Sequence, residues 1–422
     1  MNYTEAHKYI KTLTARGIMP GLKTMSRLCS ALGDPQKNLK IIHIAGTNGK
    51  GSAGSFISEI LRCAGFTAGR YISPAVENPR EIIQFNGNPI SEDEYAECAD
   101  IVKQACEKLF PLGIFPTAFE FETAMAFVFF YRKKCGFCII ECGLGGLLDA
   151  TNVIDTPEAA VITSISMDHS AYLGNSLAEI ALNKSGIIKD GGTVFSAIQS
   201  KEAADVIYKA CAKKKAELHI CQEPDIVDTN INGTIFNYKN IRNLEIKLPG
   251  IFQPDNAALA LECCAKLGID EKFIRQGLLK ASWKYRFEVT EGSPYWIYDG
   301  AHNPGAAYAL RCSLDEYLHN KKLIFIIGIF KDKDYNEILR ITAPLAHKIF
   351  AITPPSLRGL DSSVLADTAK KYCSRVIDAK NIRKAVTLCS DEQCDAVVVF
   401  GSLSFLKSIK KERLNEKMQK NI

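Results

Sequence analysis

The sequence contains no long uninterrupted apolar run, and its first residues lack the basic start and apolar stretch of a secretory signal. A membrane-spanning helix needs about 20 apolar residues, so we expect neither a membrane anchor nor export. Lysine and arginine number 52 against 47 acidic residues, and the basic residues form no stripe interleaved with aromatic ones. Because nucleic-acid-binding proteins usually carry a concentrated basic face, we expect no nucleic-acid partner. The mild positive charge suits small anionic ligands.

The 15 cysteines form no regular frame, and their number is odd. We therefore expect no disulfide scaffold and place the protein in the reducing cytoplasm. Cys135-Gly-Phe-Cys138 has the spacing of a redox pair, but Cys138 opens an apolar run, whereas a reactive pair belongs at a helix N-terminus. We interpret these two cysteines as structural. No internal repeat is apparent, and 422 residues are enough for two domains.

Residues 45–52 read Ala-Gly-Thr-Asn-Gly-Lys-Gly-Ser, between the apolar run 41–44 and a helical pattern. Glycines in such a loop let successive backbone N–H groups point at phosphate oxygens, and Lys50 adds a positive charge. A tight turn without a ligand would also use glycine, but it would not need the lysine and the hydroxyl. The spacing departs from the common nucleotide loop, because Gly51 separates Lys50 from Ser52. The predicted phosphate-binding residues of the loop are Gly46, Thr47, Asn48, Gly49, Lys50, Gly51 and Ser52.

Apolar runs alternate with helical patterns along most of the chain. Predicted strands at 41–45, 138–141, 160–165 and 193–197, with helices at 52–64, 91–109 and 119–133, favour a parallel sheet covered by helices. Residues 219–248 predict a small antiparallel sheet with a turn at Asn232-Gly233. A second series of strands follows, near 295–298, 323–328, 348–353 and 395–400. We therefore predict an α/β protein with two domains, 1–288 and 293–422.

Polar residues follow several predicted strands. Glu141 ends one strand, and Asp168-His169 follows the next. Ligands of open α/β sheets bind outside the carboxyl ends of the strands. A lone histidine is usually structural, but if both strands flank the strand of the glycine-rich loop, Glu141 and His169 converge on a magnesium ion beside the phosphates. In the second domain, Asp299 could hold a ribose hydroxyl and His302 a phosphate, whereas composition alone makes Lys184 a surface lysine.

The order of these motifs resembles the folylpolyglutamate synthase and dihydrofolate synthase family within the Mur ligase superfamily. The resemblance spans nearly the whole chain and rests on segments 46–52, 73–74, 119–121, 141–146, 149–152, 168–169, 184–189, 299–303 and 331–334. It implies an N-terminal P-loop-type Mur ligase central domain that carries the small antiparallel sheet. It also implies a C-terminal Rossmann-like α/β domain.

The resemblance also implies roles for individual residues. ATP would be bound by the loop and, from the other side, by Asn256, Arg286, Asp299 and His302. Magnesium would be ligated by Ser73, Glu141 and His169. The matching lysine of the family is carbamylated, so Lys184 would become an anionic oxygen ligand able to support a second magnesium. Lys50, His302 and Lys184 are thus the catalytic candidates.

The substrate side of the resemblance concerns two short segments. Phe119, Glu120 and Phe121, with Asp149, Ala150 and Thr151, would line the site of a flat pterin ring. Without the resemblance, the two phenylalanines would indicate plain helix core. Two stretches depart from the family: residues 75–83 lack the histidine and the Asn-Glu-Arg-Ile run of many relatives, and Phe252 stands where many have histidine.

The implied activity is ATP-dependent ligation of L-glutamate to a folate or dihydropteroate carboxylate through an acyl phosphate, by a cytoplasmic monomer. The sequence is compatible with dihydrofolate synthesis, with extension of the polyglutamate tail, or with both. Two alternatives stay open: a Mur-type ligase acting on another carboxylate, and a nucleotide-dependent switch that ligates nothing. A ligase for a peptidoglycan precursor would need a further uridine-nucleotide-binding domain, for which we see no segment. Glutamate-dependent phosphate release would separate an enzyme from a switch.

Overall fold

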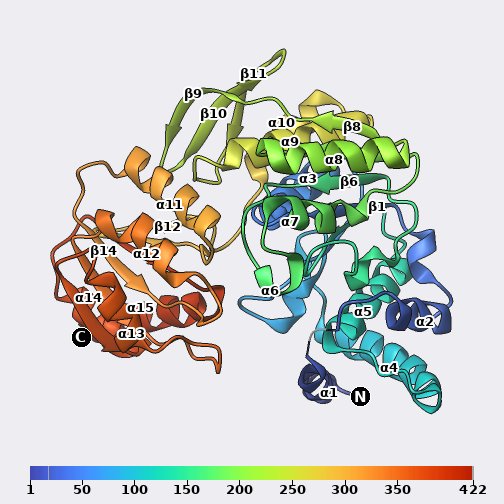
Figure 1. Cartoon of the computed structure of the whole chain (residues 1–422), viewed down its shortest axis with the longest axis horizontal. Helices are drawn as coiled ribbons and strands as arrows, with labels where there is room; N and C mark the ends of the chain where they lie inside the picture. Colours follow the sequence, from blue (N-terminus) through green and yellow to red (C-terminus); the bar gives the residue numbers. More distant parts are fainter. Residues whose placement is uncertain (18, 421–422) are drawn as a thin grey trace. The chain divides into compact units, whose positions relative to one another are not determined.

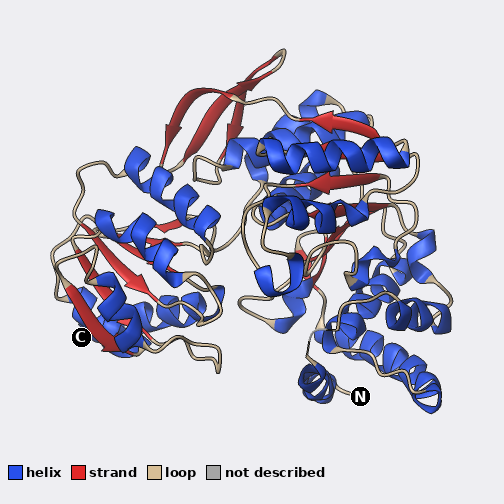
Figure 2. Ribbon diagram, viewed as in Figure 1, coloured by secondary structure: helices blue, strands red, loops and turns tan. Residues whose placement is uncertain are grey.

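The computed structural model describes residues 1–17 and 19–420 (Figures 1 and 2). Its contacts divide the chain into two compact units. The first comprises Met1–Ile165, His169–Pro224 and Asp255–Ala281, and the second comprises Ser166–Asp168, Asp225–Pro254 and the chain from Ser282 onward. Both units are α/β structures, which confirms the predicted fold class. Within the described residues no helix is long and apolar enough to cross a membrane.

The first unit is built on an eight-stranded sheet in the order β4-β3-β2-β5-β1-β6-β7-β8. Strands β2, β5, β1, β6, β7 and β8 pair in parallel, and β3 and β4 add an antiparallel edge. The strands are β1 Ile41–Ala45, β2 Ala68–Tyr71, β3 Ile83–Phe85, β4 Asn88–Pro89, β5 Phe137–Glu141, β6 Ala159–Ile162, β7 Thr193–Ser196 and β8 Glu217–Ile220. Every residue of β1 and β5 is buried, as expected for parallel strands covered on both faces.

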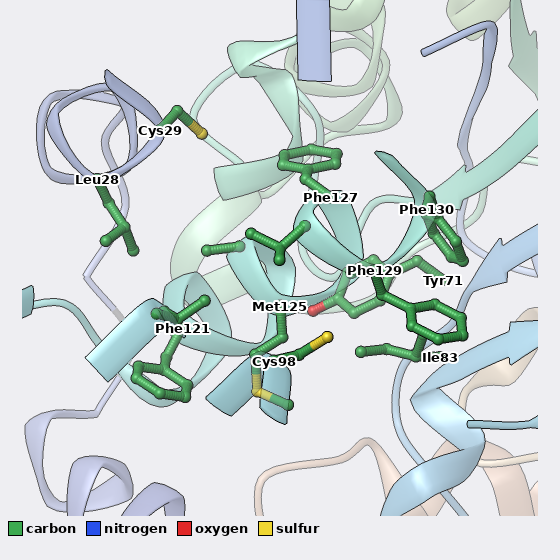
Figure 3. Packing of buried hydrophobic residues seen from close by; sticks show 14 of the residues in the cluster. Leu28, Cys29, Tyr71, Ile83, Cys98, Phe121, Met125, Phe127, Phe129 and Phe130 are labelled. Atoms are coloured by element: carbon green, nitrogen blue, oxygen red, sulfur yellow. The ribbon is translucent and has the colours of Figure 1, made fainter. Parts of the chain in front are cut away.

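Helices pack around this sheet (Figure 1). They are α1 Tyr3–Leu13, α2 Lys23–Ala31, α3 Lys50–Cys63, α4 Glu92–Leu109, α5 Ala118–Arg132, α6 Ser170–Leu173, α7 Leu177–Lys184, α8 Lys201–Lys214, α9 Gln253–Lys266 and α10 Glu271–Lys280. Capping boxes begin α4 at Ser91 and α5 at Thr117, because each hydroxyl accepts a backbone N–H three residues on. Figure 3 shows how Phe121, Met125 and Phe130 of α5 fill the core between α5 and its neighbours.

The second unit contains a six-stranded sheet in the order β12-β13-β17-β14-β15-β16 and an antiparallel sheet in the order β11-β10-β9. The strands are β9 Asp225–Asn230, β10 Gly233–Tyr238, β11 Ile241–Ile246, β12 Glu288–Thr290, β13 Tyr295–Tyr298, β14 Leu323–Ile327, β15 Lys348–Ile352, β16 Val376–Lys380 and β17 Ala396–Phe400. The helices are α11 Pro304–Tyr317, α12 Tyr335–Thr342, α13 Ser362–Ala369, α14 Ile382–Ser390 and α15 Leu406–Lys420. The predicted hairpin is confirmed by the pairing of β9 with β10, but its turn is Ile231-Asn232, because Gly233 already belongs to β10 and pairs with Asn230.

The small antiparallel sheet associates with the second unit, although the sequence suggested that it belongs with residues 1–288. Tyr317 of α11 explains this association. Its hydroxyl forms a hydrogen bond of 3.2 Å with the Thr229 hydroxyl and accepts another of 3.2 Å from the Gly250 backbone N–H. The contacts therefore divide the chain near residue 282 and place residues 225–254 beside α11.

Candidate active site

Four neighbouring parallel strands, β2, β5, β1 and β6, end at the same edge of the first sheet. Ser73 follows β2, Glu141 ends β5, the glycine-rich loop follows β1, and His169 lies beyond β6. Because β5 and β6 both flank β1, the expectation that the strands before Glu141 and His169 adjoin the loop strand is confirmed. These residues therefore emerge on the ligand-binding side of the sheet.

The glycine-rich loop has the backbone shape of an anion site. Gly46 and Gly49 have φ angles of 151° and 87°, and Gly49 caps the N-terminus of the 14-residue helix α3. The backbone N–H groups of Thr47 and Asn48 donate to the Ser164 carbonyl at 2.8 and 3.3 Å, which fixes the loop to the chain beyond β6. The first N–H groups of a helix have no partner within it, and the helix dipole favours an anion there.

Gly46→Ala tests whether this loop shape is needed for nucleotide binding. A Cβ on Gly46 would lie 1.8 Å from Thr163 Oγ1, and φ is one that side chains rarely adopt. We expect the dissociation constant for ATP, measured by calorimetry, to rise at least about tenfold, since backbone strain alone costs about 1–3 kcal/mol. Gly65→Ala is the control, because Gly65 also has a positive φ of 88° but nothing lies within 4 Å of its Cβ position. Wild-type ATP affinity in Gly46→Ala would contradict the proposed loop function.

Two lysines converge on one carbonyl of the loop. Lys50 Nζ donates to Gly46 O at 3.0 Å and to Thr47 O at 3.2 Å, and Lys184 Nζ donates to Gly46 O at 2.8 Å. Lys184 ends α7 and is buried, so the interpretation of Lys184 as a surface lysine from composition alone is wrong. Two ammonium groups that share one acceptor produce a strong local positive potential. A bound phosphate, or conversion of one lysine to a carbamate, would relieve their repulsion.

Asn256 also reaches this loop. It lies in α9, and a Cβ on Gly49 would approach Asn256 Oδ1 to 2.3 Å, so the amide packs directly against the Gly49 backbone. The structure thus brings Asn256 to the phosphate loop within the first unit and leaves no room for a side chain at residue 49.

Arg70 is a residue of the site that the sequence did not reveal. It lies in β2, its Nη2 donates to Gly51 O at 3.0 Å, and the same atom lies 3.7 Å from Glu141 Oε1. Burial lowers the pKa of Arg70 to about 10, and the Glu141 carboxylate opposes that shift, so the guanidinium stays charged at neutral pH. Arg70 therefore fixes Glu141 beside the first turn of α3. An arginine within the apolar stretch 68–72 was the available signal.

Arg70→Met should destabilise the fold strongly. Removing one member of a buried ion pair costs about 3–5 kcal/mol, because the remaining charge loses its partner. We expect urea unfolding to show a loss of this size, and Arg70→Met with Glu141→Leu to recover most of it. Arg132→Met is the control, since its ion pair with Glu97 is exposed and worth about 0–1 kcal/mol. If Arg70→Met and Arg132→Met lost the same free energy of unfolding, the buried ion pair between Arg70 and Glu141 would not be what stabilises the fold.

Two of the three predicted magnesium ligands, Glu141 and Ser73, fit a nucleotide-bound ion. In the described part of the chain no three or more His, Cys, Asp or Glu side chains gather as a metal cluster. Magnesium in nucleotide sites is usually held by one or two protein oxygens together with phosphates and water. Buried Glu141 and partly exposed Ser73 suit that mode, whereas His169 is exposed with a φ of 52° at the start of α6.

Hydrogen bonds stabilise residues 76–81, which lie in the stretch after Ser73 that departs from the family pattern. Glu81 Oε2 accepts the backbone N–H groups of Val76 and Glu77, each at 3.1 Å, and Asn78 Oδ1 accepts that of Arg80 at 3.0 Å. These bonds hold the turn that follows Ser73-Pro74. Glu81 thus orders this segment from within, in a sequence that lacks the run found in many relatives.

The predicted substrate residues fall into two groups. Phe119 is partly exposed, its ring centroid lies 6.0 Å from that of Tyr71, and it covers Gly143, whose Cβ position would be 2.5 Å from the ring. Phe121 is fully buried against Tyr9 with centroids 5.6 Å apart, and it belongs to the core in Figure 3. Phe119 is therefore placed to present a face to a ligand, and the Phe121 side chain is helix core.

Glu120, Asp149, Ala150 and Thr151 are buried. The carboxylate of Glu120 accepts the Thr117 backbone N–H at 2.8 Å and so caps α5. The carboxylate of Asp149 accepts the backbone N–H groups of Leu144 at 2.7 Å and Thr151 at 3.0 Å, which closes the loop after β5. Burial raises the pKa of Asp149, and these hydrogen bonds oppose the rise. Glu120 and Asp149, two of the predicted substrate residues, thus hold the local backbone in place.

His43 of β1 also contacts the loop after β5. Its Nε2 lies 2.8 Å from Thr151 Oγ1 and 3.2 Å from Cys142 Sγ. Burial lowers the pKa of His43 to about 3, so the imidazole is neutral at physiological pH. The strand that carries the phosphate loop is therefore tied to the loop that carries the substrate candidates.

The remaining candidates lie in the second unit. Asp299 follows β13, and its carboxylate accepts the backbone N–H groups of Phe287 and Ala301, each at 2.7 Å. Burial raises the pKa of Asp299, and the nearby Arg286 opposes the rise. His302 is partly exposed, with Nδ1 2.7 Å from Gly300 O. Arg286, Asp299 and His302 are thus brought together.

Asp168 completes this group in the second unit. Its carboxylate accepts Lys333 Nζ at 2.5 Å and Asn303 Nδ2 at 3.0 Å, and it lies 3.6 Å from His302 Nε2. The ion pair with Lys333 is buried. Sequence reasoning noted the segments of Lys333 and Asn303 only as motifs, because their meeting with Asp168 depends on tertiary structure.

A glycine-rich phosphate loop after a central strand, a buried carboxylate on the neighbouring strand and a second α/β unit define a Mur-type ATP-dependent ligase. The family model described as the Mur ligase middle domain matches residues 98–264, and that described as the Mur ligase glutamate ligase domain matches residues 285–403. Both models match without overlap, and together they cover most of the chain.

Comparison with individual relatives shows to which family of the Mur ligases the chain belongs. The dihydrofolate synthase/folylpolyglutamate synthase of Bacillus subtilis is 32% identical, over 97% of this chain and 98% of the relative. The crystal structure of Thermotoga maritima folylpolyglutamate synthase gives a TM-score of 0.85 at 32% identity, with 98% and 97% of the two chains covered. The structure of Escherichia coli FolC in complex with DHPP and ADP gives 0.88 at 26% identity, with 99% of each chain covered. The chain belongs to the dihydrofolate synthase/folylpolyglutamate synthase family of the Mur ligases.

Proposed function

We propose that this chain joins L-glutamate to the carboxylate of a folate or of dihydropteroate, with conversion of ATP to ADP and phosphate. The observation that carries the proposal is the convergence of Lys50 and Lys184 on Gly46 at the end of β1, beside buried Glu141 on β5. The names of the relatives support the choice of substrates, and the phosphate loop supports ATP.

The proposed reaction has two steps. A carboxylate oxygen of the folate attacks the γ-phosphorus of ATP, and ADP leaves, which gives an acyl phosphate. The amine of glutamate then attacks the acyl carbon and loses a proton, and phosphate departs with one oxygen of the original carboxylate. The protein forms no covalent bond, so its task is to position the reactants and neutralise charge. Lys50 and the first N–H groups of α3 do this at the phosphates.

Magnesium and the carbamate extend the proposal. Glu141, Ser73 and His169 would hold the ion, which, when bound, neutralises phosphate charge. Lys184 as a carbamate would present anionic oxygens toward a second ion and would end the repulsion between its ammonium group and that of Lys50. Asn256, Arg286, Asp299 and His302 would bind the nucleotide. We also infer a monomer and a cytoplasmic location.

A product assay tests this function. The purified protein is incubated with ATP, magnesium and glutamate plus either dihydropteroate or a tetrahydrofolate, and phosphate and product mass are measured. Phosphate release that requires glutamate, with a product heavier by one glutamyl residue, is expected with at least one substrate. Activity with both identifies a bifunctional enzyme. ATP hydrolysis without glutamate or new amide would instead favour a nucleotide-dependent switch.

A further inference from the structure

Four polar side chains lie near one another in the first unit: Glu122 and Thr123 of α5, Tyr71 of β2 and Tyr95 of α4. Glu122 and Thr123 follow Phe119 by three and four residues, so each is a neighbour of Phe119 on the helix surface. The Thr123 hydroxyl donates to Phe119 O at 2.8 Å and lies 3.0 Å from the Tyr71 hydroxyl. Glu122 is close enough to Tyr71 of β2 and to Tyr95 of α4 to raise the pKa of both phenols.

Two members of this cluster have polar groups that the fold does not satisfy. The Tyr95 side chain is fully buried, and its hydroxyl has no hydrogen-bond partner among the described residues. Glu122 has neither an ion pair nor a hydrogen bond within residues 1–17 and 19–420, and burial alone raises its pKa to about 7. Such groups are costly in a folded protein and are usually retained where a ligand supplies the missing partner.

The position of Glu122 indicates the kind of ligand. Glu122 is partly exposed, whereas the neighbouring residues Phe121 and Thr123 are buried. One turn before it, Phe119 presents a ring beside Gly143 that suits a flat heterocycle. A carboxylate next to an aromatic face can accept two parallel N–H bonds from the edge of a heterocycle stacked on that face.

We propose that Glu122 is a specificity-determining residue that accepts hydrogen bonds from the ring N–H and the adjacent exocyclic amine of the substrate pterin. Tyr95 acts as a positioning residue, since its buried hydroxyl has no partner among the described residues and can donate to the same carboxylate when the ligand holds Glu122 in the ionised form. This assignment rests on the proposed function. It adds to the predicted wall of Phe119 and Asp149 a group that selects for the amino-substituted edge of the ring.

The assignment predicts a pH dependence with a definite sign. A ligand that donates two hydrogen bonds favours the ionised carboxylate, so affinity for dihydropteroate should rise as pH increases through about 7, the pKa of Glu122. The groups that face this cluster are Tyr71 and Tyr95, with Asp149 acting on Tyr71 and Tyr3 on Tyr95. The raised pKa values of Tyr71 and Tyr95 keep both phenols neutral over this pH range.

Glu122→Gln is the decisive variant. We expect the dissociation constant for dihydropteroate at pH 8 to rise at least about tenfold, the pH dependence to disappear and ATP affinity to stay unchanged. The pKa of Glu122 is raised from 4.5 to about 7 in the folded state, so ionisation destabilises the fold as pH rises through that window. The variant should therefore melt at a higher temperature than the wild type at pH 8, and this gain should shrink at pH 5. If Glu122 only stabilised the fold, Glu122→Gln would instead melt at a lower temperature than the wild type at pH 8.

An analogue with a methyl group in place of the exocyclic amine sharpens the test. Because it keeps only the ring N–H as a donor, its affinity should differ less between the wild type and Glu122→Gln than the affinity of dihydropteroate does. Tyr95→Phe should weaken dihydropteroate binding less than Glu122→Gln does, and Glu107→Gln, at an exposed position of α4, should change nothing. The assignment would be overturned if Glu122→Gln bound dihydropteroate with wild-type affinity and pH dependence. It would also be overturned if the variant lost ATP affinity as strongly as dihydropteroate affinity and melted at a lower temperature than the wild type. Failure of glutamate-dependent phosphate release in the wild type would instead reject the proposed function.

Discussion

Lys50→Ala should lower the rate of glutamate-dependent phosphate release by at least about 10²–10³-fold, the effect of removing one preorganised electrostatic group from an active site. Lys50 is the first residue of α3 and lies at the phosphate loop, where its Nζ donates to Gly46 O and Thr47 O. A bound γ-phosphate would replace these carbonyls as its partner. The measurement is the initial rate at saturating ATP, folate and glutamate, with thermal unfolding to show that the variant is folded.

Lys37→Ala is the matched control for Lys50. Lys37 is exposed and forms an ion pair with Asp34 three residues away, so its loss should leave the rate unchanged. Lys50→Arg separates charge from geometry, because a guanidinium keeps the charge but cannot repeat the contacts of a compact ammonium. A Lys50→Ala enzyme with a near-wild-type rate would contradict the role of Lys50 at the transferred phosphate.

Lys184→Ala should reduce the rate by about 10²-fold or more, and short-chain carboxylates should restore part of it. The wild-type side chain is buried and reaches the loop at Gly46 O, 2.8 Å away. Removing it leaves a space in which an added carboxylate can present oxygens where the carbamate would present its own. The rate is measured against increasing acetate or propionate, with chloride at equal ionic strength as the salt control.

Lys209→Ala, on the exposed side of α8, controls for the loss of a positive charge. Mass spectrometry of the intact wild type under native conditions checks the carbamate directly, as an added CO₂ that disappears on acidification. An unimpaired Lys184→Ala enzyme would reject any catalytic part for Lys184. A slow variant that no carboxylate rescues would instead support a role for the ammonium group itself.

Features encoded by adjacent residues could be predicted from the sequence. The phosphate loop was identified because strand, glycines, lysine and helix follow one another within residues 41–64. Glu141 ends β5 as predicted, and the strands that precede Glu141 and His169 do flank β1. The capping box at Ser91 and the hairpin of β9 and β10 also depend only on near neighbours.

Features that depend on distant contacts were missed. Arg70 and Glu141 are far apart in sequence, and only the pairing of β2 with β5 brings them together. The burial of Lys184 depends on α7 packing against the loop after β5, and composition says nothing of that. The edge strand β8 escaped prediction because its residues are exposed or only partly buried, which gives no continuous apolar signal. The association of residues 225–254 with α11 is equally non-local.

The most direct test of the account is to follow oxygen from the folate carboxylate. Dihydropteroate labelled with ¹⁸O in both carboxylate oxygens is incubated with ATP, magnesium, glutamate and the enzyme, and the phosphate released is analysed by mass. If the carboxylate attacks the γ-phosphorus and phosphate later leaves from the acyl carbon, each phosphate carries one ¹⁸O atom and the amide retains the other. Phosphate without ¹⁸O would show that water attacks ATP, and it would contradict the acyl phosphate at the centre of the proposed reaction.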